Sequence, residues 1–204
     1  APDYDLNKLI TQDIPVYCAD SNFMLSASQD VMQESQILIG EVREGGLPTG
    51  KTIAIATGII QRLKDEFEVA PRAIVMVASK EKAFELEEQF EVLAKHTDLR
   101  VFTVFDQGII QYQRDIIYEG LDILIGTPKR LNELLKVNGI RLTQVKMLVV
   151  DDLNAYRLEQ YSLIYHLAES IPRSQFVMVA DVWNKNFEKF NERIMKNPKI
   201  IKVD

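Results

Sequence analysis

Short apolar runs alternate with longer amphipathic segments along most of this chain. Strand-like runs lie at 73–77, 99–104, 121–125, 147–150, 176–180 and 200–203. Between them, apolar positions recur with a period of 3.6 residues, which indicates helices at 53–67, 83–94, 109–118, 128–137, 156–170 and 185–195. Strands that alternate with helices in this way are typical of a mostly parallel sheet with helices on both faces. The pattern therefore predicts one three-layer α/β domain.

The first 35 residues do not follow this pattern. Pro2, Pro15 and scattered apolar positions give no sustained period, so residues 1–35 are expected to form an irregular lead-in. No internal repeat, low-complexity tract or linker divides the rest of the chain. With 204 residues, of which 47% are hydrophobic, the chain can bury a sizeable core as a single domain.

Charge and cysteine content exclude several classes of function. The 24 basic and 30 acidic residues give a formal net charge of −6, so any contact with nucleic acid must be local. Cys18 is the single cysteine and cannot form a disulfide within the chain, and His96 and His166 lack the spacing of metal ligands. No apolar run approaches the roughly 20 residues of a membrane span. These features favour a cytoplasmic protein without a membrane partner.

One segment has the spacing of a loop that binds nucleotide phosphates. It reads Gly-Gly-Leu-Pro-Thr-Gly-Lys-Thr, with four residues between Gly45 and Gly50, followed by Lys51 and Thr52. In such a loop the backbone N–H groups hold the phosphates, the lysine contacts the outer phosphates and the hydroxyl binds Mg²⁺. Pro48 departs from the pattern, because it has no N–H and restrains its neighbours. ATP or GTP, together with Mg²⁺, is the expected ligand of these two glycines, the lysine and the threonine.

Two aspartates follow an apolar strand about a hundred residues further along the chain. Asp151 and Asp152 come directly after the run 147–150, and an acidic residue at a strand end is the second requirement of a P-loop nucleotide site. Paired aspartates at such a place also begin turns or cap helices in other proteins. Together with Lys51 and Thr52, however, they predict a Mg²⁺ site at Asp151. We expect the lysine-bearing turn and the aspartates to lie side by side on adjoining strand ends.

Four segments, one of which contains the aspartate pair, resemble in order and spacing the motifs of the first RecA-like domain of a DEAD-box RNA helicase of superfamily 2. They read Ala-Ile-Val-Met-Val-Ala-Ser-Lys-Glu-Lys-Ala at 73–83, Asp-Ile-Leu-Ile-Gly-Thr-Pro-Lys-Arg-Leu at 122–131, Asp-Asp-Leu-Asn at 151–154 and Val-Ala-Asp at 179–181. The family has, in the same places, a strand running into Pro-Thr-Arg-Glu-Leu-Ala, then Thr-Pro-Gly-Arg-Leu, Asp-Glu-Ala-Asp and Ser-Ala-Thr. The resemblance covers roughly residues 23–204 and implies a RecA-like P-loop fold.

The resemblance implies that the chain contacts the RNA backbone and does not read RNA sequence. The residues that it assigns to RNA are Ser79, Lys80, Gly108, Thr127, Pro128 and Arg130. Strand ends and helix N-termini direct backbone N–H groups outward, which suits phosphate binding. Thr127 and Pro128 also make a good helix start in any protein, so a purely structural role is the alternative.

Several positions depart from the family pattern. Asp152, the expected catalytic residue, replaces the glutamate that orients the attacking water; it is one methylene shorter, a displacement of roughly 1.5 Å that can cost about a hundredfold in rate. Asn154 replaces an acid, and segment 179–181 lacks the two hydroxyl residues of the family. For adenine, the resemblance points to Gln29, with Gln33 as a competing candidate.

Two hypotheses of function follow from these observations. In the first, residues 1–204 are one RecA-like helicase domain without the second one; they bind ATP–Mg²⁺ and RNA, with weak or no hydrolysis on their own and no unwinding. A second helicase domain or a protein partner would then complete the machinery. In the alternative, the chain is a catalytically inactive pseudo-helicase that serves as an RNA- or protein-binding module.

Overall fold

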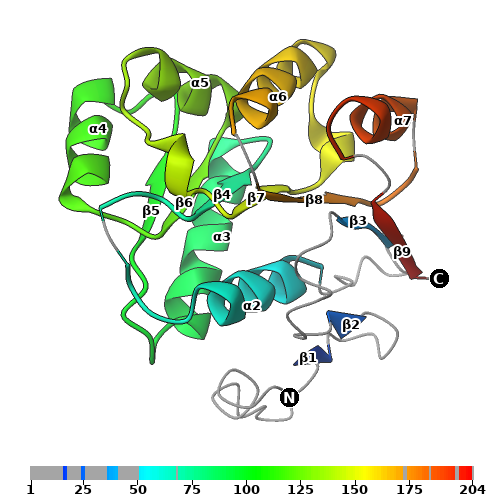
Figure 1. The fold of residues 1–204 in the computed structure, drawn as a ribbon, viewed down its shortest axis with the longest axis horizontal. Helices are drawn as coiled ribbons and strands as arrows, with labels where there is room; N and C mark the ends of the chain where they lie inside the picture. The colour runs from blue at the N-terminus through cyan, green and yellow to red at the C-terminus, as the bar shows by residue number, and fades with distance from the viewer. Residues whose placement is uncertain are drawn as a thin grey trace.

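Parallel strands form the central sheet of the computed structural model (Figure 1). The structure describes residues 16–17, 24–25, 36–40, 51–67, 69–171, 174–183, 185–195 and 198–203. Within these ranges seven strands pair in the order β5-β6-β4-β7-β8-β3-β9, and all neighbouring pairs are parallel. The strands are β3 (Gln36–Gly40), β4 (Ala73–Met76), β5 (Val101–Val104), β6 (Ile123–Gly126), β7 (Met147–Val150), β8 (Gln175–Ala180) and β9 (Lys199–Val203).

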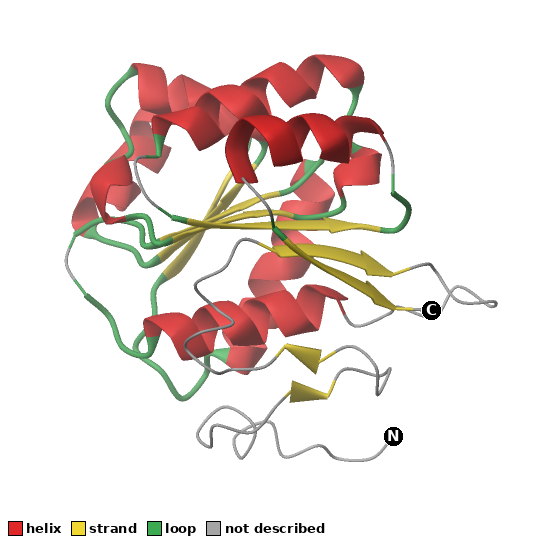
Figure 2. Cartoon of the chain, turned by 45° about the vertical axis from the view of Figure 1, so that its right-hand side comes forward, coloured by secondary structure: helices red, strands yellow, loops and turns green. Residues whose placement is uncertain are grey.

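Helices connect these strands and cover both faces of the sheet (Figure 2). They are α2 (Lys51–Leu63), α3 (Lys80–Leu93), α4 (Ile110–Glu119), α5 (Pro128–Lys136), α6 (Leu158–Ser170) and α7 (Lys185–Phe190), with a π-helical turn at Asn191–Met195 and 3₁₀ turns η1 (Leu142–Gln144) and η2 (Leu153–Ala155). A separate antiparallel pair joins β1 (Val16–Tyr17) and β2 (Met24–Leu25).

Alternate strand residues pack against the two helical layers. In β4, Ala73 and Val75 belong to the core that α2 and α3 cover, whereas Ile74 and Met76 belong to the core on the side of α4 to α7. This division follows from the two-residue period of a strand. Because both faces are buried, the strands read as continuous apolar runs in the sequence.

The expected three-layer α/β fold is confirmed, and most element boundaries shift by one or two residues. The main correction is at the end of α2, where Phe67 was expected to extend the apolar stripe of the helix. The helix ends at Leu63, because Lys64 has a left-handed φ of 61°, and Phe67 is 51% exposed. The expected irregular lead-in over 1–35 contains the short β1–β2 pair, and β3 had no predicted boundaries.

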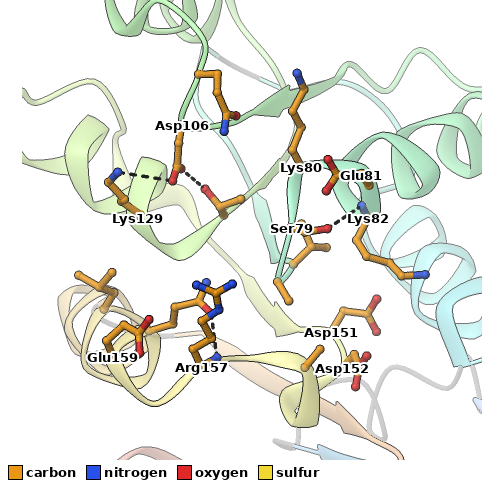
Figure 3. A pocket seen from close by; sticks show the side chains of 17 residues that line it. Ser79, Lys80, Glu81, Lys82, Asp106, Lys129, Asp151, Asp152, Arg157 and Glu159 are labelled. Atoms are coloured by element: carbon orange, nitrogen blue, oxygen red, sulfur yellow. Dashed lines mark hydrogen bonds and ion pairs between the residues drawn. The ribbon is translucent and has the colours of Figure 1, made fainter.

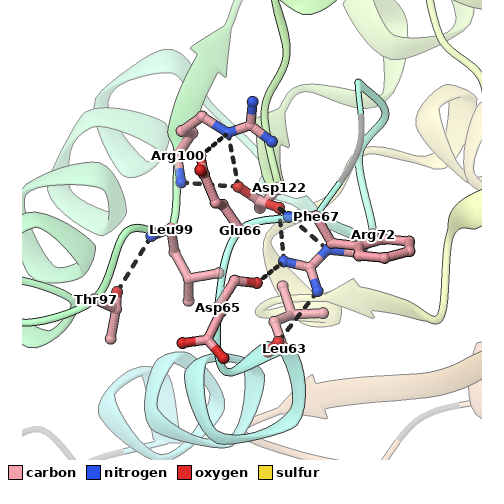
Figure 4. Close-up of polar contacts among 9 residues, drawn as sticks. All are labelled: Leu63, Asp65, Glu66, Phe67, Arg72, Thr97, Leu99, Arg100 and Asp122. Atoms are coloured by element: carbon pink, nitrogen blue, oxygen red, sulfur yellow. Dashed lines mark hydrogen bonds and ion pairs between the residues drawn. The ribbon is translucent and has the colours of Figure 1, made fainter.

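A buried carboxylate connects the starts of β4, β5 and β6 at one edge of the sheet (Figure 4). Asp122, which is fully buried, precedes β6. Its Oδ1 accepts hydrogen bonds from the Phe67 N–H at 3.1 Å and from Nη2 of Arg72 at 2.6 Å, and its Oδ2 accepts from the N–H and Nε of Arg100 at 3.1 and 2.9 Å. Arg72 also donates to the carbonyl of Leu63 at 3.1 Å, so the end of α2 joins the same network.

The two arginines keep Asp122 ionised in spite of its burial. Burial by itself would raise the pKa of the Asp122 carboxyl, but the hydrogen bonds from Arg100, Arg72 and the Phe67 N–H outweigh it and hold that pKa below its ordinary value. A carboxylate whose pKa falls on folding stabilises the protein at pH values above its unfolded pKa of about 3.9. This contribution is lost as the pH falls through the folded pKa.

Replacing Asp122 by asparagine is expected to lower the free energy of unfolding by about 3–5 kcal/mol at pH 7, because the arginines would lose their buried counter-charge. Urea unfolding followed by circular dichroism measures this. Asp98→Asn makes the same charge change at an exposed position and should stay within about 0.5 kcal/mol of the wild type. The difference between wild type and D122N should shrink below about pH 4. A gap that is equally large at pH 3 and pH 7 would contradict this account.

Candidate nucleotide and RNA site

A cleft of about 760 Å³ lies where strands β4 to β7 end (Figure 3). Each strand end contributes side chains to its wall. The charged and hydroxyl residues among them are Ser79, Lys80, Glu81 and Lys82 after β4, Asp106 after β5, Thr127 and Lys129 after β6, Asp151 and Asp152 after β7, and Arg157 and Glu159 at the start of α6. Ligands of parallel α/β sheets typically bind at this edge, and the volume is in the usual range for ligand pockets.

The cleft brings together five of the residues predicted from the sequence, namely Ser79, Lys80, Thr127, Asp151 and Asp152. Lys51 is the first residue of α2 but its side chain lies outside the described part of the structure, whereas Thr52 is described and half-buried. The predicted residues Gln29, Gly45 and Gly50 lie outside the described residues. Asp106, Lys129 and Arg157 were not predicted from the sequence, although Lys129 lies within the motif at 122–131 and Asp106 lies two residues before Gly108.

The turn at 45–50 lies outside the described residues, and the expectation that it and the aspartates follow adjoining strands is wrong. Both β3, which precedes the turn, and β7, which precedes Asp151, belong to one parallel sheet and so end at the same edge. They are not adjoining strands, because β8 pairs with both and separates them. Helix α2 leads from the end of β3 to the start of β4, which places its first residue, Lys51, at the edge that carries the cleft.

The aspartate pair lies in a tight turn at the end of β7. The N–H of Asp151 donates to the carbonyl of Met76 at 3.0 Å and extends the β4–β7 ladder by one residue. Asp152 then has φ 48° and ψ 63°, a left-handed conformation that aspartate tolerates better than most residues. Its carbonyl accepts from the N–H of Ala155 at 2.9 Å, which closes the turn η2. The strand end and the turn together fix the backbone of both acids.

The two aspartates make this part of the cleft negative. The pKa of the Lys82 ammonium is raised, first by its hydrogen bond with Glu85 at 2.7 Å and further by the charges of Asp151 and Asp152. The pKa of the Tyr156 hydroxyl is also raised, first by burial and then by the same carboxylates. Such a field favours a cation. No group of three or more His, Cys, Asp or Glu in the described ranges could hold a metal ion, so Mg²⁺ here would need phosphate and water as further ligands, as it commonly does.

The residues after β4, the strand that pairs with β7, add a cation to the lining of the cleft. Ser79 caps α3, and its hydroxyl accepts a hydrogen bond from the Lys82 N–H at 3.3 Å. The ammonium of Lys80 lies 4.5 Å from the ring centroid of Phe105 and 5.8 Å from that of Phe84. These aromatic faces stabilise the charge and limit the positions that the lysine can take.

Arg130 lies beneath the cleft and supports the turn after β5. It is 4% exposed, and its guanidinium donates to the backbone carbonyls of Asp106 and Gly108, the latter at 2.9 Å. Gly108 is packed closely: a Cβ there would come within 2.0 Å of Nε2 of Gln113. In this conformation Arg130 shapes the turn, so a direct contact between its side chain and RNA would require the turn to rearrange.

Thr127 and Pro128 make the helix start that was considered as their structural role. The Thr127 hydroxyl accepts a hydrogen bond from the N–H of Arg130 at 3.4 Å and so caps α5, with Pro128 as its first residue. Thr127 is 7% exposed and lines the cleft. Thr127 and Pro128 therefore have a structural role in starting α5, in addition to any contact that they make with a ligand.

Asn154 joins the turn after β7 to the loop after β8. Its Oδ1 accepts hydrogen bonds from the N–H groups of Asp181 and Val182 at 3.0 and 3.2 Å, and its Nδ2 donates to the carbonyl of Val182 at 3.0 Å. An aspartate could accept the first two bonds but could not donate the third. The amide therefore suits a link made to the backbone of segment 181–182.

Comparison with known proteins now identifies the family. The model of the DEAD/DEAH box helicase family matches residues 26–190. The chain belongs to this family. This finding confirms the resemblance that the motifs indicated, and the seven-stranded parallel sheet agrees with it.

The chain is similar to several members of the family. It is 30% identical over 131 residues to the ATP-dependent RNA helicase RhlB of Shewanella denitrificans, a match that covers 61% of this chain and 30% of the relative. RhlB of Shewanella sp. (strain W3-18-1) is 31% identical over a match that covers 61% of this chain and 29% of that protein. The chain thus spans less than a third of the length of these relatives.

Solved structures of yeast DEAD-box proteins share the fold. The splicing factor Prp28 superposes with a TM-score of 0.71 at 19% identity, covering 84% of this chain and 41% of that one. S. cerevisiae Dbp5, in a complex with Nup159, Gle1, IP6 and ADP, superposes with a TM-score of 0.76 at 17% identity, covering all of this chain and 52% of that one.

No helix in the described part of the chain has the length and apolarity that crossing a membrane requires.

Asn154→Ala is expected to speed hydrogen exchange at the amides of Asp181 and Val182 about tenfold, because both lose their acceptor. Exchange followed by NMR measures this. Asn154→Asp retains the acceptor oxygens and should change these rates by less than about threefold. The amide of Asp151, which donates to a backbone carbonyl, serves as the internal reference. Equal protection in the alanine variant and the wild type would show that the link does not form.

Proposed function

We propose that residues 1–204 form the N-terminal RecA-like domain of a DEAD-box RNA helicase and bind ATP–Mg²⁺ and the RNA backbone. The observation that carries the proposal is the cleft itself. It gathers Lys80, Thr127, Asp151 and Asp152 from three strand ends at the edge where α2 begins. Acidic and basic side chains at one edge suit a ligand that combines a metal ion with phosphates.

In the proposed nucleotide site, the start of α2 binds the phosphates. Lys51 and Thr52 occupy the first turn of a 13-residue helix, where free N–H groups and the helix dipole favour anions. The Thr52 hydroxyl and Asp151 would hold Mg²⁺, and Asp152 would orient the attacking water. Gly45 and Gly50 complete the phosphate loop in this proposal, and Gln29 contacts the adenine.

The proposed RNA surface runs along the other strand ends. Ser79 and Lys80 would contact one phosphate, and the backbone around Gly108 and Pro128, with the hydroxyl of Thr127, would contact its neighbours. Arg130 takes part by supporting the turn at Gly108. Contacts of this kind do not read bases, so no sequence preference is expected.

The similar proteins support the proposal that this chain works together with a second helicase domain or a protein partner. The RhlB relatives are ATP-dependent RNA helicases, and the matched region is less than a third of their length. The Dbp5 structure contains the protein partners Nup159 and Gle1. We infer that unwinding by this chain requires a second helicase domain, and that a protein partner is a possible further component.

Titration with ATP in the presence of Mg²⁺ is expected to give saturable binding that Lys51→Ala weakens at least tenfold, because the lysine supplies the charge facing the outer phosphates. Isothermal calorimetry measures the affinity and a thermal shift provides a second readout. Lys64→Ala, at an exposed position beyond the other end of α2, is the matched control. Identical titrations for wild type and the Lys51 variant would refute the nucleotide half of the proposal.

A second candidate function, an inactive pseudo-helicase that binds RNA or a protein, is favoured by the acid at position 152. Asp152 is one methylene shorter than the glutamate of the family pattern, and the turn that carries it is fixed. If its reach alone limits hydrolysis, Asp152→Glu should raise the RNA-stimulated ATPase rate, by up to about a hundredfold.

Phosphate release measured with RNA present tests this prediction. Asp152→Asn has almost the same size as the wild-type side chain but no charge, and should abolish any residual activity. Unchanged, background-level rates in both variants, with intact ATP binding, would support the pseudo-helicase.

A further inference from the structure

Asp106 places a carboxylate against the start of α5, inside the cleft (Figure 3). Its Oδ1 accepts a hydrogen bond of 2.6 Å from the hydroxyl of Thr127, and its Oδ2 lies 3.7 Å from Nζ of Lys129. A hydroxyl donor, an ammonium and the N-terminal end of a nine-residue helix form a position that suits an oxyanion. Here the protein itself supplies that oxyanion.

The turn that carries Asp106 is held in place from two sides. Arg130 donates to the carbonyls of Asp106 and Gly108, and Nε2 of Gln113 donates to the carbonyl of Phe105 at 3.2 Å. The carboxylate therefore lies on a supported backbone. Its contact with α5 follows from the packing of α4 and α5 around this turn.

The carboxylate already occupies the Thr127 hydroxyl, whereas the Lys129 side chain is 61% exposed and also lines the cleft. The Asp106 side chain retains 30% of its exposure and lines the cleft, whereas Thr127 is only 7% exposed. A phosphate that reaches the Thr127 hydroxyl from the cleft therefore meets the charge of Asp106 or has to displace it. Two oxyanions cannot occupy the same donors without strong repulsion.

We propose that Asp106 determines how tightly this cleft binds a single-stranded polynucleotide, by occupying the position of one backbone phosphate on Thr127 and Lys129. The inference rests on the proposed function, because it concerns the same RNA surface. It adds a residue whose charge opposes the ligand. A neutral side chain of the same shape would bind both donors more weakly and would not repel the phosphate, which would raise the affinity.

The test compares Asp106→Asn with Glu159→Gln. Both remove one negative charge from the wall of the same cleft, but only Asp106 contacts Thr127. In fluorescence anisotropy with a labelled uridine oligonucleotide, D106N is expected to bind about tenfold more tightly than the wild type. The slope of log affinity against log salt should steepen by about 0.7, which corresponds to one additional phosphate contact. E159Q should stay within about twofold of the wild type.

A coupling measurement separates occupation of this position from a general change of charge. Lys129→Met should weaken binding more in the D106N background than in the wild type, because there the ammonium no longer pairs with a carboxylate that competes with the phosphate. Asparagine can still accept the hydrogen bond of Thr127, so the midpoint of thermal unfolding of D106N should change by less than about 4 °C.

The outcomes distinguish this inference from the proposed function. Tighter binding and coupling to Lys129 in D106N support it, including the case in which only D106N binds RNA. Equal affinities of D106N, E159Q and a wild type that binds RNA overturn the inference and leave the proposed function intact. Failure of all variants to bind RNA overturns both the inference and the RNA half of the proposed function, and the ATP titration then stands alone.

Discussion

The parallel pairing of every strand in the described sheet is the constraint on which the site depends. It sends the amino ends of the strands to one edge and the carboxyl ends to the other. Asp122, bound to Arg72 and Arg100, fixes the starts of β4, β5 and β6 relative to one another. Because β4, β5 and β6 are only four residues long, about 13 Å, a shift at that edge would reach the residues that line the cleft. The ion-paired edge and the cleft are therefore two ends of one rigid layer.

Local patterns were sufficient to predict the fold, because the central strands β4, β6 and β7 are buried along their whole length and read as continuous apolar runs. The strand 147–150 has the bounds that its apolar run indicates. The end of α2 could not be predicted in this way, since Phe67 leaves the helix to donate its N–H to a carboxylate 55 residues away. The order of the strands was equally out of reach, because placing β8 between β3 and β7 depends on tertiary packing and not on any local period.

The sequence predicted some of the residues that line the cleft, and less of their geometry. Motif spacing found Thr127 and the aspartates, because a strand end leaves a recognisable signature. It did not reveal that Arg130 turns inward, since a buried arginine and an exposed one look alike in a sequence. The carbonyls of Asp106 and Gly108 and the carboxylate of Glu133 hold it there. Motif spacing also gave no sign of Asp106, because the group that this carboxylate contacts is the Thr127 hydroxyl, 21 residues away in the sequence.

Several residues that match the family pattern also stabilise the fold. A match at these positions is therefore not by itself evidence that the residue binds RNA. Ser79 and Thr127 cap helices and Arg130 holds a turn, so the fold alone gives a reason for each of them. Asp152 and Asn154 depart from the pattern at positions where the family pattern places chemistry. With a net charge of −6, the chain has no overall field to attract RNA. The balance of individual charges in the cleft then decides whether a phosphate binds, and a single carboxylate at Asp106 carries unusual weight in that balance.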